Sequence, residues 1–246
     1  MRRRRGQIID GVVLIDKPQE WSSNQALQRV KRVLNAQKAG HTGTLDPFAT
    51  GLLICCLGKA TKLAGRMLDA DKQYVATLKF GQETDSGDLT GQVVVDLGAD
   101  FSLPTSQQVQ DILKQFVGTI EQVPPMTSAL KHKGKPMYHY ARQGIEIERP
   151  AREVTIHDIE LLDCQGDTAV LSVHCSKGTY VRTLAQDIGR ALGVHAHLIA
   201  LKRTRIGPFS LGDAWSLAAI EEQANTLDVV TSLAALPAGY QLEVTS

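Results

Sequence analysis

The chain has 246 residues, of which 43% are hydrophobic and 22% charged, a composition typical of a soluble globular protein with one large domain or two small ones. No apolar run approaches the roughly 18 residues that span a bilayer, and no apolar stretch of signal-peptide length follows the basic start at 1–6. The four cysteines form no C-x-x-C pair, which disfavours a zinc site and predicts reduced thiols in the cytoplasm.

The net charge of +1 conceals an uneven distribution. All 27 Lys and Arg residues precede position 206, whereas five of the 26 acids follow it, so residues 1–205 carry an excess of six positive charges. Basic side chains gather in runs at 2–5, 131–135 and 202–205. Such runs suit phosphate backbones, although any single run is equally consistent with a solvated surface. Together they favour a polyanionic partner.

The first hundred residues alternate between strand-like and helix-like patterns. An apolar run ends at Pro18, and the polar residues 22–24 offer caps for an amphipathic helix. The elements predicted here are a strand at 11–15, a helix through 26–34, a strand at 52–57, a helix at 60–68, a strand at 74–80, a polar loop at 82–91 and a strand at 92–97.

The second part of the chain uses the same elements. Thr105 and Gln108 have capping-box spacing before a helical stripe that Gly118 would end. The further elements are a loop at 123–126, a hairpin of strands at 152–164 and 168–175, a helix at 183–192, a strand at 197–201 and a short helix at 217–223. Because no regular βαβ rhythm is present, we expect one α+β domain with a largely antiparallel sheet flanked by helices.

The segment 39–51 stands out because three glycines, three threonines and a proline surround a single carboxylate, Asp46. This composition predicts a loop, since the segment is too broken for a helix or strand. An Asp-Pro pair commonly initiates a turn, and local composition alone favours that role for Asp46 and Pro47. A carboxylate in such a loop with a histidine, His41, five residues before it also invites a catalytic interpretation.

Other chemistries lack their signatures. No second acid adjoins Asp46, no nucleophile-elbow motif is present, and residues 11–17 contain no phosphate-binding glycine fingerprint. His195 and His197 would share one face of a strand, but no third metal ligand is nearby, so we favour a structural role for both. The remaining option is a lone carboxylate that acts as nucleophile or base without a metal or a nucleotide cofactor.

Five segments resemble motifs of the TruB family, the tRNA pseudouridine synthases that isomerise one uridine of the T loop. The loop that carries Asp46 is one of these segments. In the segment at 200–204, Lys202 stands where the family motif has its first arginine. The segments are 39–51, LIDKP at 14–18, DKQY at 71–74, SKGTYVRT at 176–183 and ALKRT at 200–204. The resemblance spans about 8–240 and implies a pseudouridine-synthase-like fold. We expect a catalytic domain at 8–205 and a short acidic tail at 206–246 without the full PUA-type module common in bacterial members. The chain is then either a shortened member or a fragment.

The resemblance assigns roles to the polar site residues. It makes Asp46 the catalytic residue and Arg182 the arginine that pairs with it, which would keep the carboxylate ionised and aimed. It gives His41 the role of holding the target loop of the RNA, rather than that of a general base. Lys17 would support the active-site loop or contact the nucleic acid.

The same resemblance implies a pocket for a flipped-out uracil. Tyr74 would stack on the base, and Tyr180 and Leu201 would line the pocket. Without the motif, a core tyrosine on a half-buried strand would be the simpler interpretation of Tyr74. The lysines at 131–135 are expected in an exposed loop that contacts phosphates.

The implied reaction converts uridine 55 of tRNA to pseudouridine by exchanging the N1–C1′ bond for a C5–C1′ bond. Whether Asp46 attacks the sugar, attacks the base or abstracts a proton stays open. The expected partner is the T stem-loop of tRNA, with no membrane, metal or cofactor, and we expect a monomer. Two alternatives are an RNA-binding or tRNA-folding chaperone without essential chemistry, and a cofactor-free glycosidase, which the basic runs disfavour.

Overall fold

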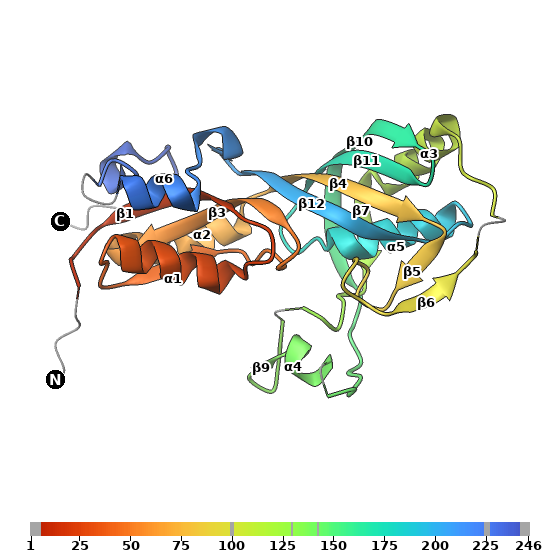
Figure 1. The fold of residues 1–246 in the computed structure, drawn as a ribbon, viewed down its shortest axis with the longest axis horizontal. Coiled ribbons are helices and arrows are strands. Elements are labelled where there is room, and N and C mark those ends of the chain that lie inside the picture. The colour runs from red at the N-terminus through yellow and green to blue at the C-terminus, as the bar shows by residue number, and fades with distance from the viewer. Residues whose placement is uncertain (1–5, 99–100, 129, 142, 224–226, 242–246) are drawn as a thin grey trace. The chain divides into compact units, whose positions relative to one another are not determined.

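The computed structural model describes residues 6–98, 101–128, 130–141, 143–223 and 227–241, so the basic run at 2–5 lies outside the described residues. The chain divides into two compact units. Unit 1 combines Met1–Lys72 with Lys202–Ser246, and unit 2 is Gln73–Leu201 (Figure 1). Within the described ranges, no helix is both long and apolar enough to cross a membrane.

Unit 1 is built on a mixed sheet in the order β14-β1-β3-β12, with β2 also paired to β3 and β13 to β12. The pairing is antiparallel except between β3 and β12, which run parallel. Its elements are β1 (Gly11–Lys17), α1 (Ser23–Val33), β2 (Ala39–Thr42), β3 (Thr50–Leu57), a 3₁₀ helix (Gly58–Leu63), α2 (Ala64–Asp69), the second half of β12 (Ala196–Ile206), β13 (Phe209–Ser210), a 3₁₀ turn (Leu211–Asp213), α6 (Leu217–Glu222), β14 (Thr231–Ser232) and a second 3₁₀ turn (Leu233–Ala235).

Both faces of β1 and β3 are covered, so these strands are almost continuously apolar. On one face, Val13 and Leu53 pack with residues of α1 and α6, and on the other, Leu14 and Ile54 pack with α2. The acidic tail belongs to this structure, because it supplies buried residues to both layers. These residues are Phe209, Ile220, Val229 and Leu236.

Helix α1 begins where its polar residues predict. Ser22 is the N-cap, and its side chain and that of Gln25 form the reciprocal hydrogen bonds of a capping box. An ion pair between Arg29 and Glu221, with 2.7 Å between Nε and Oε1, joins α1 to α6 on the surface of unit 1. The helix is therefore anchored at its N-terminus and along its outer face.

Unit 2 contains a second set of strands in the order β12-β4-β11-β10-β7, in which β10 runs antiparallel to β11 and β7. Helix α3 packs against β10 and α5, and α5 buries most of its apolar face. The elements are β4 (Lys72–Phe80), β5 (Gln82–Thr84), β6 (Val93–Asp96), α3 (Ser106–Leu113), a 3₁₀ turn (Lys114–Phe116), β7 (Gly118–Gln122), β8 (Lys131–His132), β9 (Lys135–Pro136), α4 (Met137–Ala141), β10 (Arg152–Gln165), β11 (Thr168–Cys175), α5 (Val181–Ala191) and the first half of β12.

The α+β class and the largely antiparallel sheet are confirmed. Four local predictions need correction. Residues 39–42 are a strand because β2 pairs with the buried β3, and residues 82–84 form β5 through pairing with β6. The expected loop at 131–135 is the β8–β9 hairpin, and the helix at 60–68 is 3₁₀ up to Leu63. The strand β7 was not predicted at all. In the four strand cases the hydrogen bonds come from a partner strand, which local composition does not reveal.

Gly51 marks the closest backbone approach in unit 1. It pairs with Arg203 across β3 and β12 and has a φ of +100°. A Cβ atom at this position would lie 2.3 Å from the Arg203 carbonyl oxygen and 2.7 Å from its nitrogen. Only glycine therefore allows β3 and β12 to pair at this point.

Gly51→Ala should destabilise the protein by about 3 kcal/mol or more, because left-handed strain of roughly 1–2 kcal/mol adds to backbone overlap. Gly118→Ala is the matched control, since Gly118 has a φ of +104° but no atom within 4 Å of an added Cβ. Urea unfolding should show the smaller loss in the control. Equal losses in both variants would show that the approach to Arg203 is not tight.

Candidate active site

Asp46 lies in the connection between β2 and β3 and is half-buried. The connection is anchored by apolar side chains, since Leu45 and Phe48 are each 3% exposed and Ala49 is fully buried. The amide of Ala49 donates to the carbonyl of Asp46 over 3.1 Å. The carboxylate is thus carried by a packed loop rather than by a free surface segment.

The amine of Lys17 lies inside unit 1, at the end of β1. Lys17 is fully buried, and its Nζ donates to the carbonyls of Pro18 at 2.8 Å, Trp21 at 2.5 Å and Pro47 at 3.3 Å. Burial lowers the pKa of Lys17 to about 8, and the Asp46 carboxylate opposes this shift. Lys17 therefore supports the loop through the residue that follows Asp46.

Arg203 is a second buried cation of unit 1, with 1% of its surface exposed. Its Nε donates to the carbonyl of Leu52 at 2.8 Å, and its Nη2 donates to that of Gly43 at 3.2 Å. Because Gly43 precedes Asp46 and Leu52 follows it, Arg203 contacts the loop on both sides of the acid.

Two further side chains bind the loop backbone directly. The hydroxyl of Ser23 accepts a hydrogen bond from the Leu45 amide at 2.8 Å and donates to the Leu45 carbonyl at 3.1 Å. Asp16 Oδ1 accepts from the Gly51 amide at 3.0 Å. With Lys17 and Arg203, these contacts hold the segment from Gly43 to Leu52 in one conformation.

His41 lies on β2 and is half-buried. In the described part of the chain, its Nδ1 has no hydrogen-bond partner, and neither does the hydroxyl of the neighbouring Thr42. Burial lowers the pKa of His41, and the positive charge of Arg203 lowers it further. The imidazole is therefore neutral near pH 7, and among the described residues its buried Nδ1 has no partner.

In unit 2, Tyr180 occupies the N-cap position of α5, and the buried Gln122 holds its backbone. The Tyr180 amide donates to Gln122 Oε1 at 3.0 Å, and Gln122 Nε2 donates back to the Tyr180 carbonyl at 3.4 Å. A side-chain amide at the end of β7 thus fixes the start of α5.

Arg182 lies two residues further on and is 4% exposed. Its Nη1 donates to the Ser86 carbonyl at 2.9 Å, to Asp88 Oδ2 at 3.3 Å and to the hydroxyl of Thr127. Nη2 donates to the Thr127 carbonyl at 3.3 Å. The guanidinium is held rigidly by these bonds and by a buried ion pair, while its pairing with Asp46 stays a prediction.

Tyr74 and Leu201 lie on β4 and β12 and are 9% and 8% exposed. Tyr74 occupies one of the buried positions of a strand in which burial alternates residue by residue. These two predicted pocket residues are therefore anchored in sheet strands, which position side chains more accurately than loops do.

A cavity of about 600 Å³ lies in unit 2, and its lining includes Thr127, which binds Arg182. The predicted site residues of unit 2 do not line the cavity. These residues are Tyr74, Tyr180, Arg182 and Leu201. Its wall carries more carboxylates than cations, which disfavours a phosphate backbone there. The charged lining residues are Glu83, Asp85, Glu121, Glu146, Asp187, Arg149 and Arg190.

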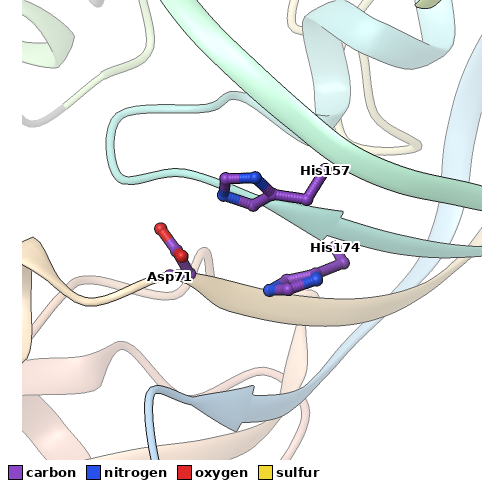
Figure 2. Close-up of side chains that lie close together, drawn as sticks. All are labelled: Asp71, His157 and His174. Carbon is purple, nitrogen blue, oxygen red and sulfur yellow. The ribbon is translucent and has the colours of Figure 1, made fainter. Parts of the chain in front are cut away.

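Two histidines that the sequence did not single out lie side by side on β10 and β11 (Figure 2). The ring centroids of His157 and His174 are 4.8 Å apart and the rings are tilted by 50°.

His195 and His197 are the histidines that the sequence analysis considered as metal ligands. His195 contacts Glu83 through Nδ1 at 2.9 Å, and His197 contacts the Gln82 carbonyl at 3.1 Å. Both contacts fit a structural role.

Two family models together match most of the chain. The TruB family pseudouridylate synthase N-terminal domain matches residues 31–181, and the tRNA pseudouridylate synthase B C-terminal domain matches residues 182–234. The chain belongs to the TruB family. It is therefore a pseudouridine synthase, an isomerase, and the acidic tail falls largely within the second family domain.

Curated TruB relatives and solved structures agree with this assignment. The chain is 60% identical over 239 residues to tRNA pseudouridine synthase B of Bordetella pertussis, covering 97% of this chain and 98% of that protein. It is 55% identical to the Aromatoleum aromaticum protein of the same name, covering 89% and 70%.

Among solved structures, a chain of the Cbf5-Nop10-Gar1 complex matches with a TM-score of 0.71 and 32% identity, covering 89% of this chain and 56% of that chain. A chain of an H/ACA RNP bound to a substrate RNA containing 2′-deoxyuridine matches with a TM-score of 0.67 and 26% identity, covering 92% and 60%. The protein thus spans only a little over half the length of these two chains.

The structure groups the predicted TruB site residues within each unit. Lys17, His41 and Asp46 belong to unit 1, and the other four belong to unit 2. Sequence reasoning missed Ser23 and Gln122 as supports. Ser23 carries only the signature of a helix cap, and Gln122 falls in the unpredicted β7. The residues of unit 2 are Tyr74, Tyr180, Arg182 and Leu201.

The basic run at 202–205 also needs correction in one position. Lys202 and Arg205 are exposed, but Arg203 points into unit 1 because burial alternates along β12. Arg203 therefore supports the loop and is not available to phosphates. In the hairpin at 131–135, Lys133 and Lys135 are exposed, as a phosphate-binding role requires.

Lys17→Met should lower the catalytic rate at least tenfold, because it leaves the Pro47 carbonyl and two others without their donor. Lys59→Met is the control, since the Lys59 side chain is 68% exposed in the same unit. Pseudouridine formation under saturating RNA would measure the effect. A full rate in Lys17→Met would show that this amine does not hold the loop.

Proposed function

We propose that this protein converts uridine 55 in the T loop of tRNA to pseudouridine, with Asp46 as the catalytic residue. Membership of the TruB family supports the reaction, and the near full-length relatives named tRNA pseudouridine synthase B support tRNA as the substrate. The observation that carries the assignment of Asp46 is its loop, which buried donors hold on both sides of the acid.

The reaction is an isomerisation that needs no net oxidation or added atom. The N1–C1′ bond breaks, the uracil turns within the site, and C5 bonds to C1′ while its proton is lost and N1 regains one. A carboxylate suits this chemistry when it is ionised and fixed. The Asp46 carboxylate interacts electrostatically with the buried amine of Lys17.

The other residues act on binding. Tyr74 stacks on the flipped uracil, which contributes about 1–3 kcal/mol toward the few kcal/mol that flipping costs. Tyr180 and Leu201 line the uracil pocket, and Arg182 pairs with Asp46. His41 holds the RNA target loop, a role supported by the TruB family match over residues 31–181.

The partner we propose is the T stem-loop of tRNA, bound by a monomer in the cytoplasm. The excess of six positive charges over residues 1–205 favours a polyanion. Exposed lysines in the β8–β9 hairpin, Lys133 and Lys135, would contact phosphates and make the affinity depend on salt. The chemistry itself resides on unit 1, where Asp46 lies.

Asp46→Asn should abolish pseudouridine formation while tRNA affinity stays within about tenfold of wild type, because the amide keeps the shape but not the charge. Mass mapping of unmodified tRNA incubated with wild type should show one product, at position 55, and none with the variant.

Asp213→Asn is the control, since Asp213 is an exposed acid of the same unit. A transcript with cytidine at position 55 should yield no product. Turnover near wild type in Asp46→Asn would refute the catalytic assignment and favour an RNA-binding or RNA-folding role for this residue. A product at another uridine would refute the T-loop assignment.

A further inference from the structure

Ser23 has a contact that its place in the sequence does not explain. It is the first residue of α1, but the N-cap is Ser22, which completes its capping box with Gln25. Ser23 is 1% exposed, and its hydroxyl is occupied by Leu45, 22 residues away in the chain. Helix capping therefore explains the contacts of Ser22 but not those of Ser23.

The two hydrogen bonds of Ser23 constrain both peptide planes that flank Leu45. The Leu45 amide belongs to the plane shared with Thr44, and the Leu45 carbonyl belongs to the plane shared with Asp46. Fixing the second plane fixes the N–Cα bond of Asp46, so that the direction of its Cα–Cβ bond depends only on rotation about this bond. The buried Leu45 side chain, 3% exposed, prevents the segment from rotating as a whole.

On the other side of the acid, the Asp46 carbonyl accepts from the Ala49 amide, and the Pro47 carbonyl accepts from Lys17. Ser23 is the support that lies directly before the carboxylate. An active-site group that is misplaced by about 1 Å can lose roughly 100-fold in rate. The position of this hydroxyl therefore bears on catalysis rather than only on stability.

We propose that Ser23 is a positioning residue, which sets the direction of the Asp46 carboxylate through the backbone of Leu45. The inference rests on the proposed catalytic role of Asp46. It gives the first turn of α1 a second function besides helix formation, with adjacent serines divided between the helix and the catalytic loop.

The test compares Ser23→Ala with Ser22→Ala in steady-state assays on tRNA. Ser23→Ala should lower kcat by about 10- to 100-fold with KM within threefold, because binding groups are untouched. Ser22→Ala removes a helix cap and should lower Tm by about 2–4 °C with kcat unchanged. Ser23→Cys keeps a weaker hydrogen-bonding group of similar shape and should give an intermediate kcat.

The outcomes separate positioning from general stability. The inference is wrong if Ser23→Ala has the same kcat as wild type. It is also wrong if Ser23→Ala and Ser22→Ala have equal Tm and kcat falls no further in Ser23→Ala than in Ser22→Ala. If Ser23→Ala does not fold, Ser23→Cys decides, and an unchanged kcat in that variant overturns the inference. An active Asp46→Asn would instead overturn the proposed function, whatever the serine variants show.

Discussion

The burial of two cations constrains the geometry of the candidate active site. Lys17 and Arg203 are almost completely withdrawn from water, which costs several kcal/mol for each ion unless its donors are satisfied. The acceptors include the carbonyls of Gly43, Pro47 and Leu52, all close in sequence to Asp46. Moving the loop would leave a buried cation without its acceptors, so the loop conformation is tied to the fold of unit 1.

In unit 2, buried side chains likewise hold the backbone or the side chain of predicted site residues. Gln122 binds both backbone groups of Tyr180, as Ser23 binds both of Leu45. Arg182 is held by an ion pair with Asp88 and by two groups of Thr127. In each case a buried side chain fixes the main chain or the guanidinium beside a functional position. This arrangement provides preorganisation, which catalysis requires more than tight substrate binding.

The sequence predicted elements whose signals are local. Alternating apolar residues predicted β4, and the capping-box spacing of Thr105 and Gln108 predicted the start of α3. The predicted site residues came from motif resemblance. The residues that support the loop could not be predicted from the sequence. The role of Ser23 depends on a contact across 22 residues, and the burial of Arg203 depends on the register of β12 against Gly51. β2 was missed since its hydrogen bonds come from β3.

Hydrogen exchange at the Leu45 amide measures whether the loop that carries Asp46 is fixed by the core of unit 1. This amide donates to the buried hydroxyl of Ser23. If the loop is tied to the fold, the amide should exchange only through opening of unit 1, with protection close to that of amides in β3. Exchange at the rate of an exposed loop would show that the loop opens independently, and would contradict this account.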